Sequence, residues 1–231
     1  MRCITGRDTF SAAQHLTTIL RQYTNLTQLG EPTAGKPNHY GAIKTLSLPN
    51  SGLPIQVSQV YHQDATPWEF NTTSRPHVHV SPTAEDCREN RDPMLDRVLT
   101  FDEIKATPAR LTEEVAAAYR AGGIEGLKKK YFELRPEYLK AGVDLRDPLV
   151  DFFTPLYRIN KSLDDQLAYG NFVVAEYPGE AFILYALGTQ YAQIGQYDKA
   201  HEMLQRCLDA YPGNANARRE MRVLDLAMSR R

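Results

Sequence analysis

A short motif near the C-terminal end recurs after 34 residues, and it constrains the fold of this chain more than any other feature. Tyr-Pro-Gly-Glu-Ala at 177–181 returns as Tyr-Pro-Gly-Asn-Ala at 211–215. From Leu111 onward, apolar residues recur at intervals of three and four, a spacing typical of α-helices. A period of this length in helical sequence predicts pairs of helices that stack on neighbouring pairs.

The segment 181–214 resembles a tetratricopeptide repeat, which has the same period. When Pro212 is set at the closing proline, the signature positions of that repeat fall on Leu184, Leu187, Gly188, Tyr191, Ala200, Leu204 and Cys207. Gly188 and Ala200 are small enough to let two helices touch, and the larger residues fill the space around that contact. An accidental helical hairpin is the alternative interpretation.

The 34 residues before this repeat match the motif poorly, because Gln166 and Gly170 stand where alanine and a bulky residue belong. We therefore predict one good repeat, one degenerate repeat and capping helices in a helical, tetratricopeptide-like tail over residues 103–231. Gln190 and Gln193 are expected to be exposed on it. Such a tail has a concave face on which segments of partner proteins can bind.

Residues 1–102 mix helical and strand patterns and are predicted to form a separate domain. An amphipathic helix is expected over 10–23, and alternating runs at 42–48 and 53–61 around the turn Pro49–Gly52 predict a β-hairpin. A third strand is expected at 77–80 and a short helix at 93–101. The expected fold class is α/β, with a mixed sheet and helices, followed by the all-α tail.

Composition excludes several classes of function. The chain of 231 residues has 27 basic and 28 acidic residues, so nothing in its net charge attracts nucleic acid. No apolar run reaches the length of a membrane span, and the chain as given is expected to be soluble. The three cysteines fit neither a disulfide framework nor a zinc motif. His77 and His79 share one face of a strand but have no evident third ligand, so no metal is predicted.

Ser11 and Lys36 are the candidate catalytic residues. Ser11 opens the predicted helix, where free amides such as that of Ala12 could stabilise an oxyanion. Ser11 and Gln14 also fit a capping box, the structural alternative. Lys36 could serve as the base for a serine if its pKa were lowered, although a loop lysine is ordinarily a solvated charge.

The segment from Ile4 to about Leu99 resembles the C-terminal part of the core domain of the tail-specific, or C-terminal processing, serine peptidases. Four segments carry this resemblance: Gly6-Arg-Asp-Thr-Phe-Ser-Ala-Ala-Gln14, Gly30-Glu-Pro-Thr-Ala-Gly-Lys-Pro-Asn-His-Tyr-Gly41, Leu48-Pro-Asn-Ser-Gly52 and Arg91-Asp-Pro-Met-Leu95. The resemblance implies a ClpP/crotonase-like core. Since that core begins well upstream of its nucleophile, it also implies a fragment of a longer enzyme.

By this resemblance Ser11 is the nucleophile, and Lys36, 25 residues later, is its base. The chain departs from the family pattern at Ala13, Gln14 and Tyr40. Gln14, His39 and Tyr40 would support the site if the loop folds over Ser11, and ordinary loop packing is the alternative for His39. The implied substrates are polypeptides, cleaved near their C-termini without metal or cofactor. Members of this family are typically exported or periplasmic, and the compartment of this chain is left open.

The predicted function is therefore that of a serine peptidase with a Ser/Lys dyad. The alternative is a non-catalytic binding or scaffold protein, in which the tail binds partners and a degenerate peptidase remnant supports it. An inactive fragment is a third possibility.

Overall fold

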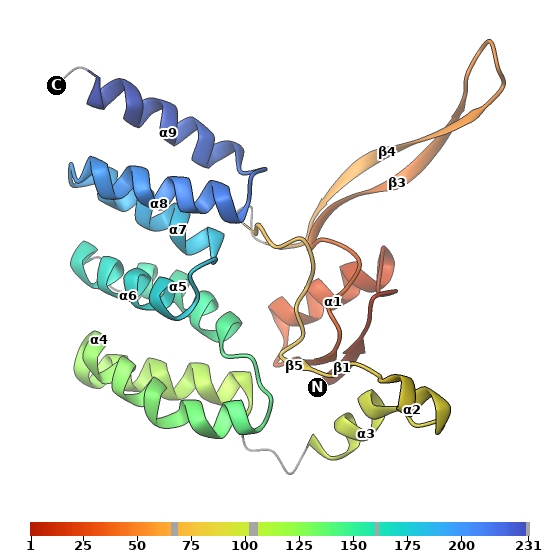
Figure 1. Cartoon of the computed structure of the whole chain (residues 1–231), viewed down its shortest axis with the longest axis horizontal. Coiled ribbons are helices and arrows are strands. Elements are labelled where there is room, and N and C mark those ends of the chain that lie inside the picture. Colours follow the sequence, from red (N-terminus) through yellow and green to blue (C-terminus); the bar gives the residue numbers. More distant parts are fainter. Residues whose placement is uncertain (66–68, 102–105, 160–161, 230–231) are drawn as a thin grey trace. The chain divides into compact units, whose positions relative to one another are not determined.

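The chain folds into two compact units, residues 1–105 and 106–231 (Figure 1). The computed structural model describes residues 1–65, 69–101, 106–159 and 162–229. The domain boundary that the sequence predicts, between residues 102 and 103, lies outside these described residues. Each unit is described by itself below.

The first unit combines strands and helices, which confirms the α/β character expected for this part of the chain. In its described residues the elements are β1 (Arg2–Thr5), α1 (Ala12–Tyr23), β2 (Thr27–Gly30), β3 (Asn38–Ser47), β4 (Pro54–Gln63), β5 (Val78–His79), α2 (Ala84–Arg88) and α3 (Pro93–Leu99). The expected helices at 10–23 and 93–101 and the expected strand at 77–80 are all present.

Three of these strands form a parallel sheet in the order β1-β2-β5. Ile4 lies opposite Leu29, and Leu29 lies opposite Val78. Leu29 and Val78 are fully buried, so the core of this unit lies at the middle strand. Gly30 ends β2 with a φ of 109°, and a Cβ there would lie 2.2 Å from the Thr5 carbonyl oxygen, so only glycine fits.

Helix α1 buries the side opposite to the one that its sequence pattern predicts. An amphipathic helix normally places its apolar side against the core. Here Gln14, Thr17 and Thr18 are buried, whereas Leu16 and Tyr23 are exposed. Their hydrogen-bond donors find partners: the Gln14 amide nitrogen donates to Thr18 Oγ1 at 3.0 Å and to a serine of a distant loop. Gln14 Oε1 is buried without a partner among the described residues.

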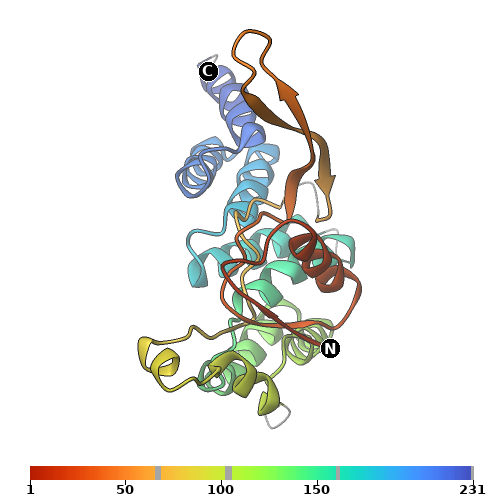
Figure 2. The same cartoon turned by 90° about the vertical axis from the view of Figure 1, so that its right-hand side faces the viewer.

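The predicted hairpin is confirmed as β3 and β4, an antiparallel pair that extends as an arm (Figure 2). Tyr40 lies opposite Tyr61, and Leu46 lies opposite Ile55. The amide of Gly52 donates to the Leu48 carbonyl at 2.9 Å and closes the turn. Residues 42–60 are all exposed, so both faces of the arm are open to solvent within this unit.

The second unit is all-helical, as predicted. In its described residues the helices are α4 (Pro108–Lys140), α5 (Arg146–Ile159), α6 (Leu163–Glu176), α7 (Ala181–Gln193), α8 (Tyr197–Ala210) and α9 (Ala215–Met228). None of the helices in the described ranges combines the length and the apolar character that a bilayer span requires.

Helix α4 is a hairpin of two antiparallel arms. Its backbone leaves the helical conformation at Gly122 and Gly123, where φ is −143° and 61°. A Cβ at Gly126 would lie 2.7 Å from the carbonyl oxygen of Ala118, eight residues earlier, whereas eight residues of straight helix span about 12 Å. In the described ranges of this unit, three helical hairpins, α4, α5/α6 and α7/α8, are therefore followed by α9.

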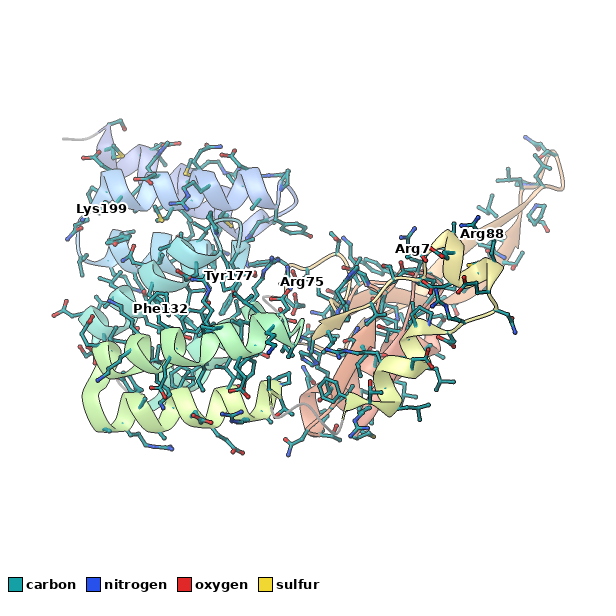
Figure 3. All side chains as sticks on the ribbon, turned by 60° about the horizontal axis from the view of Figure 1, so that its bottom comes forward. Arg7, Arg75, Arg88, Phe132, Tyr177 and Lys199 are labelled. Carbon is teal, nitrogen blue, oxygen red and sulfur yellow. The ribbon has the colours of Figure 1, made fainter. Side chains whose placement is uncertain are left out.

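The repeated Tyr-Pro-Gly motif forms the same turn in both copies. The Tyr177 amide donates to Val173 at 2.8 Å, and the Tyr211 amide donates to Cys207 at 2.8 Å. Each tyrosine directly follows the last residue of a helix, and the next helix begins four residues after the tyrosine. Figure 3 shows Tyr177 among the side chains of the second unit, where the guanidinium of Arg146 lies 5.3 Å from the centre of its ring.

The predicted packing of the best repeat is confirmed, since its seven signature positions listed above are all buried. A Cβ on Gly188 would lie 2.7 Å from Leu204 Cγ, so glycine is what lets α7 and α8 touch.

The expected exposure of Gln190 is wrong. Its side-chain nitrogen donates to Gln166 Oε1 at 2.8 Å between α7 and α6, and this hydrogen bond links the two buried glutamines. Gln190 Oε1 has no hydrogen-bond partner among the described residues. Gln193 is exposed, as expected.

Candidate functional site

The turn that carries Ser11 holds this residue in a strained conformation. Ser11 connects the β1 strand to α1 with φ 54° and ψ −120°, a region that residues other than glycine rarely adopt. The alternative interpretation of Ser11 and Gln14 as a capping box is wrong, because the Ser11 side chain makes no capping hydrogen bond and Gln14 points into the core. The Ser11 side chain is therefore exposed at the N-terminus of the helix.

The Ala12 amide belongs to the first residue of α1. The first amides of a helix have no intrahelical acceptor, so this one can donate to a group placed beside Ser11. The residue predicted to supply an oxyanion donor thus lies in the position that such a donor requires.

The loop that carries Lys36 packs against the Ser11 turn. The Ala34 amide donates to the Thr9 carbonyl at 3.0 Å, and a Cβ on Gly35 would lie 3.1 Å from Gln14 Cγ. Lys36 itself is exposed. In the described part of the chain, no hydrogen bond joins the Ser11 hydroxyl to Lys36 or to any other group. The fold brings the two predicted segments together but does not join the two side chains.

Gln14 supports this turn from inside. Its side chain is fully buried, and its amide nitrogen donates to Ser74 Oγ at 2.8 Å, which ties α1 to the segment before β5. The sequence predicts Gln14 as a supporting residue. These contacts hold α1, the helix that follows Ser11, in position, so the role that the structure gives Gln14 is structural.

His39 and Tyr40 lie at the base of the hairpin. The ring of Tyr40 is 73% exposed and packs on Tyr61, with ring centroids 4.9 Å apart. The ring of His39 stacks on His62 at 5.2 Å. Both residues therefore pack against the opposite strand of the hairpin, and within the described residues neither has a hydrogen bond to Ser11.

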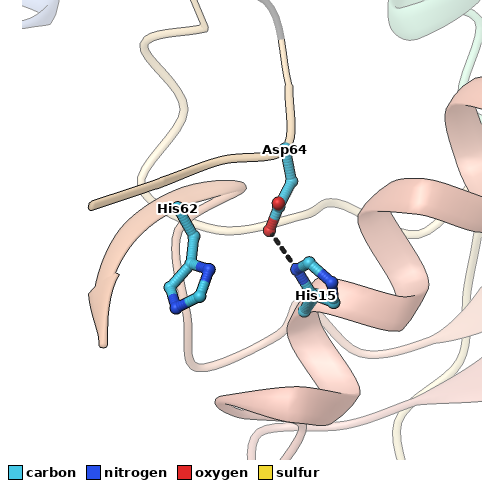
Figure 4. A group of neighbouring side chains, drawn as sticks. All are labelled: His15, His62 and Asp64. Carbon is cyan, nitrogen blue, oxygen red and sulfur yellow. Dashed lines mark hydrogen bonds and ion pairs between the residues drawn. The ribbon is translucent and has the colours of Figure 1, made fainter. Parts of the chain in front are cut away.

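A cluster that the sequence did not predict lies beside this turn. His15 of α1, His62 of β4 and Asp64, just after β4, place their nitrogen and oxygen atoms close together (Figure 4). The spacing His62-Gln-Asp64 was the available signal, but its partner lies 47 residues earlier in the sequence. His77, by contrast, accepts a hydrogen bond from the Gln28 amide at 3.0 Å and belongs to the core.

The second unit has a groove between α7 and α9. Residues from both helices line it: Thr189, Ala192, Gln193, Glu220, Val223 and Ala227. Val223 is 58% exposed, although it is apolar. Tyr185 lies near α9, and burial together with the charge of Glu220 raises the pKa of its hydroxyl. The groove therefore offers apolar contacts bordered by amide, hydroxyl and carboxylate groups.

In a comparison with known proteins, one family model matches part of this second unit. A tetratricopeptide repeat model matches residues 181–221. A search of curated proteins found no match. One solved structure, the first TPR of Spaghetti (RPAP3) bound to HSP90 peptide SRMEEVD, is similar over 53% of this chain and 93% of that chain, with 16% identity and a TM-score of 0.36. The helical unit thus contains a tetratricopeptide repeat, and the peptidase resemblance of residues 1–102 stays a prediction.

Proposed function

We propose that this chain is a protein-binding protein whose helical unit recognises a segment of a partner polypeptide. The observation that carries the proposal is the tetratricopeptide repeat match at residues 181–221. Repeats of this kind stack into surfaces on which other polypeptides bind. From the sequence this function is the alternative to peptidase activity, and the repeat match supports it better than it supports peptidase activity.

The groove between α7 and α9 is the proposed binding surface. Val223 and Ala192 offer an apolar floor for an anchoring side chain, and the exposed amide of Gln193 can hydrogen bond to the backbone of the bound segment. Binding energy at such surfaces is concentrated in a few buried contacts. A charge placed at Val223 should therefore weaken binding, since it would have to lose its hydration when a partner covers it.

The test is peptide selection followed by titration. Peptides displayed on phage are selected on the wild-type chain, and the affinity of the best one is measured for Val223→Asp and for Leu139→Asp. Leu139 is a matched control, because it is also 58% exposed but lies on the second arm of α4, outside the groove. We expect Val223→Asp to weaken binding about tenfold or more and Leu139→Asp to leave it unchanged. If the two substitutions weaken binding equally, the groove is not the binding surface.

Serine hydrolysis is the second candidate function, and it is carried by the strained, exposed Ser11 at a helix N-terminus. Ser11 would attack a peptide carbonyl, Lys36 would accept its proton, and the Ala12 amide would hold the oxyanion. A fluorophosphonate probe tests this function: it should label the wild-type chain and not Ser11→Ala. Lys36→Ala should slow labelling, whereas Lys44→Ala on the hairpin arm should not. If the wild-type chain takes no label, this candidate is excluded for the chain.

A further inference from the structure

Two histidines and one aspartate of the first unit meet where α1 approaches the end of β4. His15 Nδ1 lies 2.6 Å from Asp64 Oδ2, and a ring nitrogen of His62 lies within 4.8 Å of both ligand atoms. The rings of His15 and His62 meet edge to face, with centroids 5.7 Å apart. Figure 4 shows the three side chains facing one another. Three atoms able to bind a metal thus converge on one point.

His62 is held in place on two sides. The ring of His39 stacks on it, and a Cβ on Gly41 would lie 2.9 Å from His62 Nε2, so the ring lies directly over the glycine backbone. The Nδ1 side of His62 is then turned toward His15 and Asp64 (Figure 4). A side chain fixed by its neighbours loses little conformational freedom when it binds a ligand.

The hydrogen bond between His15 and Asp64 leaves other polar atoms of this cluster able to bind a ligand. The side chain of Asp64 is only 9% exposed, and among the described residues its carboxylate interacts with His15. His39 Nδ1, in the ring stacked on His62, is buried without a partner among the described residues. Buried polar atoms in proteins are ordinarily paired. The hydrogen bond between His15 and Asp64 alone does not explain why three histidines gather here.

We propose that His15, His62 and Asp64 bind one divalent first-row transition-metal ion. Imidazole nitrogens and a carboxylate oxygen are common ligands of such ions, at about 2.0–2.2 Å. Two ligands of a tetrahedral ion are then about 3.4 Å apart. The distance between His15 and Asp64 would open by less than about 1 Å, and His62 would move toward them. A fourth position stays open for water.

The ion would join the hairpin to the helix that begins at Ser11. His15 comes from α1, and His62 and Asp64 come from the end of β4, so coordination would link two elements far apart in the sequence. A ligand that binds only the folded state stabilises that state. Metal binding should therefore raise the unfolding temperature of the chain.

Metal titration of the full-length, untagged chain tests the proposal. Zn²⁺ is the first probe, because sites of this type bind it more tightly than Fe²⁺, which also favours two histidines and a carboxylate. We expect one equivalent of Zn²⁺ to bind and to raise the unfolding temperature, with reversal by a chelator. Anaerobic competition between Fe²⁺ and bound Zn²⁺ shows which of the two ions the site prefers.

Near-isosteric substitutions decide whether this cluster is the site. His62→Gln and Asp64→Asn should each weaken Zn²⁺ binding more than about tenfold. His79→Gln is the matched control, because His79 is an exposed histidine of the same unit. Circular dichroism confirms that each variant is folded before titration. The proposal is overturned if the wild type binds no stoichiometric Zn²⁺, or if His62→Gln binds it as tightly as His79→Gln.

Discussion

Two glycines show how single residues set the distance between helices in the second unit. A Cβ on Gly170 of α6 would lie 2.7 Å from Leu187 Cδ2, and a Cβ on Gly188 of α7 would lie 2.7 Å from Leu204 Cγ. In each case a leucine of the following helix occupies the space that a side chain would need. Gly170 departs from the repeat motif in the sequence, yet it makes the same kind of contact one helix earlier.

Gly188→Val should destabilise the helical unit by about 2 kcal/mol or more, because Leu204 is buried and has little room to move aside. Urea unfolding followed by circular dichroism measures the change. Gly179→Val is the matched control, since nothing lies within 4 Å of a Cβ at that position. If the two variants unfold at the same urea concentration, the close contact between α7 and α8 is not stabilising.

Helix α4 consists of two antiparallel arms that pack on each other. Gly122 and Gly123 reverse the chain, and the two arms are then joined by an ion pair of 2.7 Å between Arg110 and Glu137. The second arm buries Tyr138, whose hydroxyl donates to the Thr107 carbonyl at 3.0 Å. A buried phenol is stable in its neutral form and unstable once ionised.

This burial predicts a loss of stability at alkaline pH. Burial raises the pKa of Tyr138 to about 12, whereas an exposed tyrosine has a pKa of about 10. Because the folded-state pKa is the higher one, the stabilisation is complete below about pH 10 and declines as the pH rises toward 12. The free energy of unfolding, measured by urea titration across this range, should fall.

Tyr138→Phe should make that decline less steep, and Tyr23→Phe, at a tyrosine that is 78% exposed, should leave it unchanged. Burial also raises the pKa of Tyr131 and of Tyr169, so part of the decline should remain in the Tyr138→Phe variant. An identical decline in wild type and Tyr138→Phe would contradict this assignment.

At the scale of the molecule, the two units differ in how much apolar surface they bury. In the described residues of the first unit, the buried large apolar side chains are Leu26, Leu29, Val78 and Phe101. The second unit buries residues from each of its helices, including Tyr131, Leu149, Tyr169 and Leu187. A larger apolar core supports independent stability, so the helical unit is the better candidate for folding alone.

A chain truncated to residues 106–231 should therefore remain helical and unfold cooperatively in urea. A chain truncated to residues 1–105 should unfold less cooperatively and bind an apolar dye, because Phe10, Leu16 and Tyr23 remain exposed on and beside α1. Circular dichroism and dye fluorescence measure both. Equally sharp unfolding of the two truncated chains would show that the small core of the first unit suffices.

The sequence by itself determined the helical repeat and the β-hairpin. Both follow from patterns that can be read along the sequence. These are the 34-residue period from Tyr177 to Tyr211, the small residue Gly188, and the turn that ends at Gly52. Local periodicity and turn residues are legible without tertiary information. The position of Ser11 at a helix start follows from the same kind of local pattern. The pairing of Ser11 with the Lys36 loop is not a local pattern, and only the resemblance predicts it.

Only the tertiary structure decided which polar residues are buried and which distant residues meet. Gln14 and Gln190 can be buried because the amide nitrogen of each donates to a residue of a distant segment. His15 reaches His62 and Asp64 because the hairpin returns to α1 after its turn. Burial of polar groups and convergence of side chains depend on long-range packing, which the order of residues along one segment does not contain.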